Sequence, residues 1–278
     1  MAGPGPASPD SFLPGDAAPK IAFEAVSRDF AAPDGSRFTA LDRFSLDVAD
    51  GEFVTVVGPS GCGKSTAMAI AAGLTLPTAG RVLVDGRPVR GPGPDRGVIF
   101  QQYALFPWLT VRRNVEFGLE IAGRPRAERR AIADRFIDLV GLTPFAEALP
   151  KTLSGGMKQR CAIARAYAVD PAILLMDEPF GALDALTRVG LQDQLLDTWS
   201  RERRTVMFIT HDVEEAVYLA SRVVVMAARP GRLHSVIPVD LPYPRTEEMR
   251  LSPGFAALRN RVWRAVYHPN EHRESPTC

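Results

Sequence analysis

The chain has 278 residues, and its 33 lysines and arginines nearly balance 32 aspartates and glutamates, so the formal net charge is +1. This balance argues against a protein built to neutralise nucleic-acid phosphates, and we expect no nucleic-acid partner. The three cysteines are too few for a disulfide framework. No stretch approaches the roughly 18 apolar residues of a membrane span, and no secretory signal begins the chain, so we expect a cytoplasmic protein.

The chain begins with a segment that we expect to be disordered. Residues 1–20 hold five prolines and three glycines and almost no branched aliphatic residues. From Ile21 onward, short apolar runs alternate with helical patterns, which predicts an α/β fold with a parallel sheet. The predicted strands are Ile21–Val26, Phe53–Val57, Val98–Phe100, Ile173–Met176, Val206–Ile209 and Val223–Met226.

The middle of the chain has a different pattern. From about Thr110 to Val169 the sequence is helical and contains no strand, which indicates an all-helical insertion within the sheet domain. One apolar helix face there is formed by Ile132, Phe136, Leu139 and Val140. Past Pro238 the chain becomes rich in proline and then offers one amphipathic helix, whose predicted apolar face is Phe255, Leu258, Val262, Trp263 and Val266.

A phosphate-binding loop is the strongest motif. The segment matches G-x-x-x-x-G-K-[ST] in full, between a predicted strand and a predicted helix. Its residues are Gly58, Pro59, Ser60, Gly61, Cys62, Gly63, Lys64, Ser65 and Thr66. Glycines let the backbone wrap around phosphate oxygens, and the N–H groups of the helix terminus point at the anion. Lys64 supplies a positive charge to the β- and γ-phosphates, and the Ser65 hydroxyl can bind Mg²⁺.

Two carboxylates follow the apolar strand Ile173–Met176. Ligands of open α/β sheets gather at the carboxyl ends of the strands. Asp177 is therefore expected to hold Mg²⁺ beside the Ser65 hydroxyl. Glu178 points away from Asp177, and we predict that it is the general base for an attacking water.

A second anion-binding helix terminus follows Leu153. Ser154 is a good N-cap, and Gly155 and Gly156 expose the backbone N–H groups before the predicted helix Gln159–Val169. One phosphate loop already surrounds the phosphates of one nucleotide, so this second terminus is surplus unless it serves a nucleotide held by another subunit. The simplest arrangement is a two-fold, head-to-tail dimer with two ATP molecules between the chains.

Together these motifs make the chain resemble an ATP-binding cassette (ABC) ATPase from about Ile21 to Pro238. By that resemblance, Gln101 is the glutamine that senses Mg²⁺ and water, and His211 is the switch histidine that contacts the γ-phosphate. Asp184, in Ala182-Leu183-Asp184, resembles the residue that communicates across the dimer. Phe30 resembles the aromatic residue that stacks on adenine, and Phe38 is the other candidate.

The resemblance implies a P-loop NTPase fold with ATP and Mg²⁺ as ligands. The cassette is expected to span 21–239, with a helical subdomain inserted at about 103–169 and a small antiparallel β part near its N-terminus. Residues 240–278 form a C-terminal extension. Met157 departs from the commonest family form, which has glutamine at that position of the signature, but the groups that face phosphate are intact.

Further similarities point to a bacterial importer. The aromatic segment Tyr103–Leu109 resembles the groove that receives a coupling helix of the membrane subunit, with Phe106 and Trp108 as anchors. The segments Arg229–Arg232 and Val239–Arg245 are similar to those of nitrate, sulfonate and taurine importers. The expected partners are a second copy of the chain, permease subunits at the cytoplasmic face of the cell membrane and, indirectly, a solute-binding protein.

Two alternative functions fit the sequence less well. One is a soluble ABC-type ATPase that acts on a non-membrane partner; such proteins usually carry two cassettes or long coiled-coil insertions, and neither is present here. The other is a P-loop kinase for a small molecule, which does not explain the Ser154-Gly155-Gly156 terminus.

Overall fold

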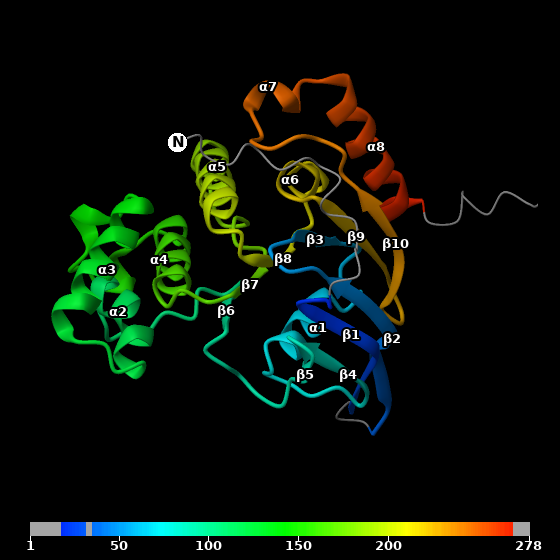
Figure 1. The fold of residues 1–278 in the computed structure, drawn as a ribbon, viewed down its shortest axis with the longest axis horizontal. Helices are drawn as coiled ribbons and strands as arrows, with labels where there is room; N and C mark the ends of the chain where they lie inside the picture. The colour runs from blue at the N-terminus through cyan, green and yellow to red at the C-terminus, as the bar shows by residue number, and fades with distance from the viewer. Residues whose placement is uncertain (1–17, 32–34, 269–278) are drawn as a thin grey trace, which may run out of the picture.

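The computed structural model describes residues 18–31 and 35–268, so the expected disordered tail lies outside the described residues except for its last three positions. The described part contains two sheets and three groups of helices (Figure 1). Helices α2 to α4 stand to one side of the sheets, whereas α6 and α8 pack on the larger sheet.

The larger sheet has six strands in the order β10-β9-β3-β8-β7-β6. Every neighbouring pair is parallel except the antiparallel pair of β9 and β10. Residues of the central strands are buried throughout, because these strands are apolar runs covered on both faces. The strands are β3 (Phe53–Val57), β6 (Arg96–Ile99), β7 (Ile173–Asp177), β8 (Thr205–Ile209), β9 (Arg222–Ala227) and β10 (Arg232–Pro238).

The smaller sheet is antiparallel and lies near the N-terminus, as the predicted fold class requires. Its order is β2-β1-β4-β5, formed by β1 (Ile21–Ala31), β2 (Arg37–Val48), β4 (Ala79–Val84) and β5 (Arg87–Pro88). The predicted strand Ile21–Val26 is only the first half of β1. The predicted strands do not include β2, β4, β5 and β10. Strands β2, β4 and β10 mix exposed and buried residues rather than forming continuous apolar runs, and β5 is only the exposed pair Arg87–Pro88.

The helical insertion contains α2 (Val111–Ile121), α3 (Arg126–Leu139) and α4 (Gly155–Ala168), with the short 3₁₀ turns η2 (Thr143–Phe145) and η3 (Pro150–Thr152). The predicted face of α3 is correct in that Phe136 and Val140 are buried against α4 and its neighbours. The predicted helix start at Gln159 was wrong. Helix α4 begins four residues earlier at Gly155, because the Ser154 hydroxyl accepts a hydrogen bond from Met157 N and caps it.

The other helices are α1 (Lys64–Ala71), α5 (Ala185–Glu202), α6 (Val213–Leu219), α7 (Glu247–Arg250) and α8 (Pro253–Tyr267). Phe255 and Val262 of α8 are fully buried and fix the helix to the cassette. The prediction that Trp263 belongs to this apolar face was wrong. Its side chain is 47% exposed and packs on Tyr267 and His268, one turn further along the helix.

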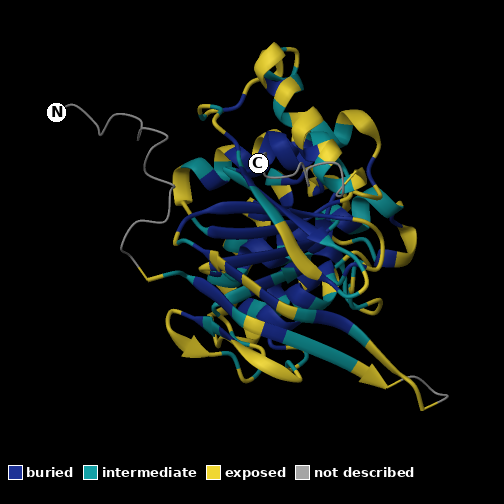
Figure 2. Ribbon diagram, turned by 90° about the vertical axis from the view of Figure 1, so that its right-hand side faces the viewer, coloured by how far each residue is buried: buried dark blue, intermediate teal, exposed yellow. Residues whose placement is uncertain are grey.

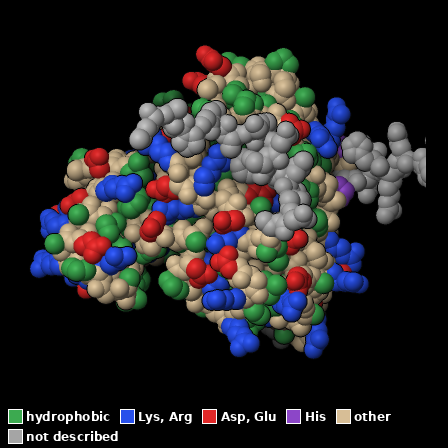
Figure 3. Space-filling model, in the orientation of Figure 1, with side chains coloured by type: hydrophobic (Ala, Val, Ile, Leu, Met, Phe, Trp, Pro, Cys, Tyr) green, Lys and Arg blue, Asp and Glu red, His purple; other side chains and the backbone are tan. Residues whose placement is uncertain are grey.

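Buried residues form two hydrophobic clusters, one on each face of the large sheet. The first joins the sheet to the helical insertion, α5, α6 and α8, and the second joins it to α1 and the small sheet. Figure 2 shows the sheet strands as the buried interior, with exposed residues on the outer helices and strand ends. Lys and Arg side chains are interspersed with Asp and Glu over the face in Figure 3. Among the described residues, no helix has both the length and the apolar character needed to cross a membrane.

Candidate functional site

The phosphate loop connects β3 to α1, as predicted. Its lysine folds back over the loop: Lys64 Nζ donates to Gly58 O at 2.8 Å and to Pro59 O at 3.1 Å. Lys64 is only 8% exposed, so its ammonium group is held where the loop encloses it. A phosphate oxygen entering the loop would find this charge already oriented.

Glycine is needed at two positions of the loop for different structural reasons. Gly63 adopts φ +89°, and a Cβ there would lie 2.7 Å from both Ala40 O and Leu41 Cδ2. Gly61 adopts φ +76°, but a Cβ there would meet nothing within 4 Å. Gly63 therefore serves the packing of the loop on β2, whereas Gly61 borders open space that a ligand can occupy.

The expected metal ligands Ser65 and Asp177 come together at the end of β7. Asp177 is 7% exposed, and its burial raises the pKa of the carboxyl group. A hydrogen bond from the Ser65 side chain and the charge of Lys64 act in the opposite direction, whereas the charge of Glu178 raises the pKa further. One buried carboxylate and one hydroxyl suit Mg²⁺, which is bound in nucleotide sites through one or two carboxylates and the substrate phosphates.

Glu178 contacts two other predicted site residues, Gln101 and His211. Gln101 Nε2 donates to Glu178 Oε2 at 3.3 Å, and His211 Nδ1 lies 3.1 Å from the same oxygen. Glu178 itself has φ +47°, in the left-handed region that few side chains adopt. Three segments that follow β6, β7 and β8 thus converge on one carboxylate at the carboxyl edge of the sheet.

Ser154 and its two glycines lie at the exposed N-terminus of α4. Among the described residues, Ser154 makes no hydrogen bond to Lys64 or Glu178; its hydroxyl accepts from Met157 N at 3.3 Å. A Cβ at Gly155 would come within 2.9 Å of Tyr103 Oη, so glycine permits the segment after Gln101 to approach this helix end. Met157 packs against the hydrophobic core.

The remaining predicted ligand residues are spread over the surface. Phe30 and Phe38 face each other across the β1–β2 pair and are 39% and 52% exposed. The guanidinium of Arg28 lies 4.7 Å from the Phe30 ring centre. Asp184 caps α5 by accepting from Thr187 N, and this hydrogen bond lowers the pKa of its carboxyl group.

No sequence pattern predicts the residues that brace the aromatic segment after Gln101. Asn114 is fully buried; its Oδ1 accepts from Phe106 N, and its Nδ2 lies within hydrogen-bond distance of the carbonyls of Phe106, Leu109 and Thr110. Arg165 donates to Ala104 O and Tyr103 O. The segment is therefore a braced platform from which Trp108, 72% exposed, projects. A single asparagine in a helix gives no sequence signal for this role.

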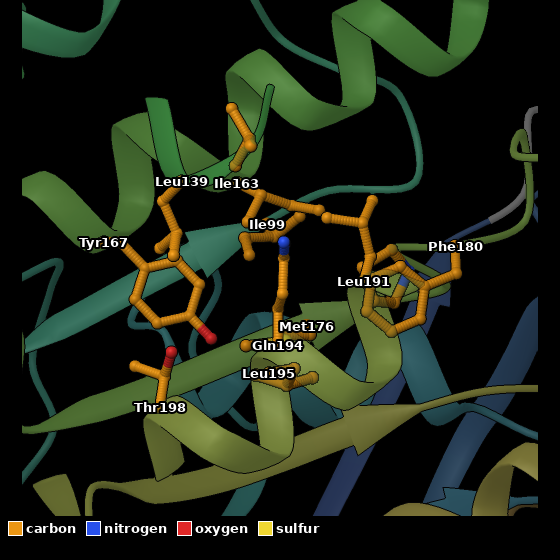
Figure 4. A pocket seen from close by; sticks show the side chains of 12 residues that line it. Ile99, Leu139, Ile163, Tyr167, Met176, Phe180, Leu191, Gln194, Leu195 and Thr198 are labelled. Atoms are coloured by element: carbon orange, nitrogen blue, oxygen red, sulfur yellow. The ribbon is translucent and has the colours of Figure 1, made fainter. Parts of the chain in front are cut away.

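A small apolar pocket is lined in part by Pro179 and Phe180, which follow Glu178 (Figure 4). Its walls come from α3 and α4 of the helical insertion, from β6 and β7, and from α5. Most of the labelled side chains are apolar, and they include Leu139, Ile163, Met176, Phe180, Leu191 and Leu195. Beside the site, the helical insertion thus meets the sheet domain mainly through apolar side chains, and the ion pair between Arg135 of α3 and Glu202 of α5 also joins the two parts.

Comparison with known proteins agrees with this geometry. Residues 41–181 match the ABC transporter family. A protein of Brucella abortus named as an ATP-binding protein, BAB2_1147, is 75% identical over 250 residues, which are 90% of this chain and 94% of that one.

Two named importer subunits and one solved structure are also similar. The nitrate import ATP-binding protein NrtD of Synechocystis is 51% identical over 78% of this chain and 81% of its own length. The aliphatic sulfonates import ATP-binding protein SsuB of Bacillus licheniformis is 49% identical over 81% of this chain and 86% of its own. The dimeric ABC transporter cassette MJ0796 superposes with a TM-score of 0.74 and 33% identity, covering 79% of this chain and 98% of that one.

Proposed function

The chain belongs to the ABC transporter ATP-binding family and is an ABC-type ATPase, and from that premise we propose that it drives a bacterial importer. In this role it couples ATP hydrolysis to the uptake of a small solute through permease subunits at the cytoplasmic face of the cell membrane. The similarity to the import subunits NrtD and SsuB supports the importer role, and the convergence of Gln101 and His211 on one oxygen of Glu178 supports the hydrolytic role.

The chemistry assigned to the site is the attack of water on the γ-phosphate. Glu178 accepts the proton of the water as the new oxygen–phosphorus bond forms and the bond to the β-phosphate oxygen breaks. Lys64 and His211 stabilise the charge of the transferring phosphoryl group. Mg²⁺, held by Ser65 and Asp177 with Gln101 near it, would supply further charge neutralisation on the phosphate oxygens.

The complete site requires a second copy of the chain. The relative MJ0796 forms a dimeric cassette. In this chain the exposed helix N-terminus at Ser154 is suited to bind phosphate. Among the described residues, Ser154 makes no hydrogen bond to Lys64 of the same chain. We assign Ser154, Gly155, Gly156 and Asp184 to the nucleotide bound by the partner copy, and one of Phe30 and Phe38 to the adenine ring.

We assign the docking site of the permease to the platform around Trp108. A large, exposed aromatic side chain on a braced segment has the character of an interface anchor. The same segment begins two residues after Gln101, so movement of a docked permease helix would reach the hydrolytic residues over a short stretch of chain.

The solute is proposed to be a small oxyanion of the nitrate, sulfonate or taurine class. This assignment follows the names of the relatives NrtD and SsuB and the resemblance of the segments Arg229–Arg232 and Val239–Arg245 to such importers. A solute-binding protein and the permease would select the solute, because the candidate site of this chain is built to bind phosphate rather than a transported solute.

Glu178→Gln tests the hydrolytic assignment. The amide cannot accept a proton from water, so ATP turnover should fall by roughly 10²-fold or more while ATP binding persists. The variant should also accumulate as a closed dimer with ATP, measured by scattering. Glu120→Gln, a change at a surface ion pair on α2, is the matched control and should keep wild-type turnover. Wild-type turnover in Glu178→Gln would refute the assignment of the base.

A further inference from the structure

A chain of polar contacts joins the C-terminal extension to the segment that carries His211. It runs from Arg250 at the end of α7, through Gln192 in the middle of α5, to Glu215 in the first turn of α6. None of these residues belongs to a motif of the sequence, and Arg250 lies outside the resemblance to the cassette. The contacts nevertheless end one turn of helix from His211.

Asp212 fixes the helix start next to His211. Its Oδ1 accepts from Glu214 N at 2.8 Å and Glu215 N at 3.1 Å, which caps α6. Its own N–H donates to Thr210 Oγ1 at 3.0 Å. The backbone on both sides of His211 is therefore held by hydrogen bonds, although the His211 side chain is 68% exposed.

Glu215 connects this cap to the interior. It is 5% exposed, and burial raises the pKa of its carboxyl group, whereas hydrogen bonds from the Thr210 and Gln192 side chains act in the opposite direction. Thr210 thus contacts Glu215 as well as Asp212, so displacement of Glu215 would disturb both ends of the segment 210–212. Glu215 also lines one small polar cleft together with Glu178, Arg188 and His211.

Gln192 is the central link, and only one orientation of its side-chain amide satisfies both partners. Nε2 donates to Glu215 Oε1 at 2.8 Å, and Oε1 accepts from Arg250 Nη2 at 2.6 Å. The reverse orientation would set an amide donor against a guanidinium and an amide oxygen against a carboxylate. Gln192 is 2% exposed, so water cannot readily replace either partner.

Arg250 is held in position by more than this hydrogen bond. Its guanidinium carbon lies 3.6 Å from the centre of the Tyr218 ring, and Nη1 lies 3.8 Å from Glu214 Oε1. The side chain is 14% exposed. Both of these neighbours belong to α6, so Arg250 contacts the helix that follows His211 directly as well as through Gln192.

The extension has other attachments that do not depend on Arg250. Tyr243 Oη donates to Leu219 O, and Arg245 Nη2 donates to Ala220 O. Phe255 and Val262 of α8 are fully buried. A change at Arg250 should therefore leave the extension attached while removing its polar link to Gln192.

We propose that Arg250 is a positioning residue for ATP hydrolysis: through Gln192 and Glu215 it holds the Thr210–Asp212 segment so that His211 meets Glu178. The C-terminal extension thereby helps to position a residue of the hydrolytic site. This inference rests on the proposed function of Glu178 and His211.

Arg250→Ala breaks the link at its start in the C-terminal extension, and Gln192→Leu breaks it at its centre. Arg261→Ala changes an exposed arginine on α8 as a control. Displacement of a catalytic group by a fraction of an ångström costs rate rather than binding, so both variants should lower kcat about tenfold with KM for ATP within about twofold of wild type. Arg250→Lys, which keeps a donor and the charge, should recover part of kcat. Equal kcat in Arg250→Ala and Arg261→Ala, or a parallel loss of nucleotide affinity, would overturn the proposal.

A second measurement separates positioning from general destabilisation. In a His211→Ala background, Arg250→Ala should change kcat by less than about twofold, because its effect passes through the missing histidine. An undiminished tenfold effect in that background would overturn the proposal. The proposed function fails by a different result, namely wild-type turnover in Glu178→Gln, which does not involve Arg250.

Discussion

At the level of the single residue, Gly61 and Gly63 of the phosphate loop permit different features. Gly63 sits against Ala40 and Leu41 of β2, whereas Gly61 borders open space, although both have φ in the left-handed region. Gly63 is required by the fold, whereas Gly61 allows backbone N–H groups to approach an anion. Substitution with alanine should separate these two requirements.

Gly61→Ala should lower the free energy of unfolding by about 1–2 kcal/mol, the conformational cost of an alanine at positive φ. Its main effect should be weaker nucleotide binding. Gly63→Ala adds a clash at 2.7 Å with backbone and core atoms, so about 1–3 kcal/mol more should be lost. Urea unfolding and nucleotide titration of both variants measure the two quantities. Equal loss of stability in both would contradict the distinction.

The buried carboxyl of Glu215 makes stability depend on pH. Burial raises its pKa above the ordinary value of 4.5. As the pH rises from there, the unfolded chain loses this proton before the folded chain does, so the free energy of unfolding declines until the raised pKa is passed. In Glu215→Gln this contribution is absent, and urea unfolding between pH 4.5 and 7.5 should show a stability difference that moves in favour of the variant. Parallel pH profiles would contradict this expectation.

At the level of elements, the platform around Trp108 depends on the start of α2. Asn114→Ala removes a fully buried side chain whose amide satisfies the backbone of Phe106, Leu109 and Thr110. Leaving these groups unpaired should cost about 2–4 kcal/mol and speed hydrogen exchange of the amides of 105–110. Asn260→Ala, on the exposed side of α8, should change stability by less than about 0.5 kcal/mol. Unchanged exchange in Asn114→Ala would show that the segment is held by other contacts.

The elements also show what the sequence could predict. Strands β3, β7, β8 and β9 were placed to within a residue or so, because strands covered on both faces are continuous apolar runs. Edge strands β2 and β10 were missed, because one face of each is polar. The phosphate loop, Asp177 and Glu178 follow from local motifs. The link from Arg250 to Gln192 joins common residue types 58 positions apart, and no local pattern distinguishes it.

For the whole molecule, the separation of Lys64 from the Ser154 terminus is the central feature. The helical insertion that carries Ser154 stands beside the sheet domain (Figure 1) and meets it through the apolar pocket of Figure 4. We propose that both helix termini bind phosphate, and among the described residues no hydrogen bond joins Ser154 to Lys64. A dimer provides a nucleotide for each terminus without rearranging the fold of either chain.

Ser154→Arg tests this arrangement at the scale to which it belongs. The larger side chain at an exposed helix start should leave the fold intact and leave nucleotide affinity of the single chain within about threefold, because Lys64 and its loop are unchanged. It should abolish the ATP-dependent dimer when combined with Glu178→Gln, and it should abolish turnover alone. Lys64→Ala should instead lose nucleotide affinity first. Scattering and nucleotide titration distinguish the two variants: if Ser154→Arg weakens binding to the isolated chain as strongly as Lys64→Ala does, the nucleotide is enclosed by one copy and the dimer is not needed to complete the site.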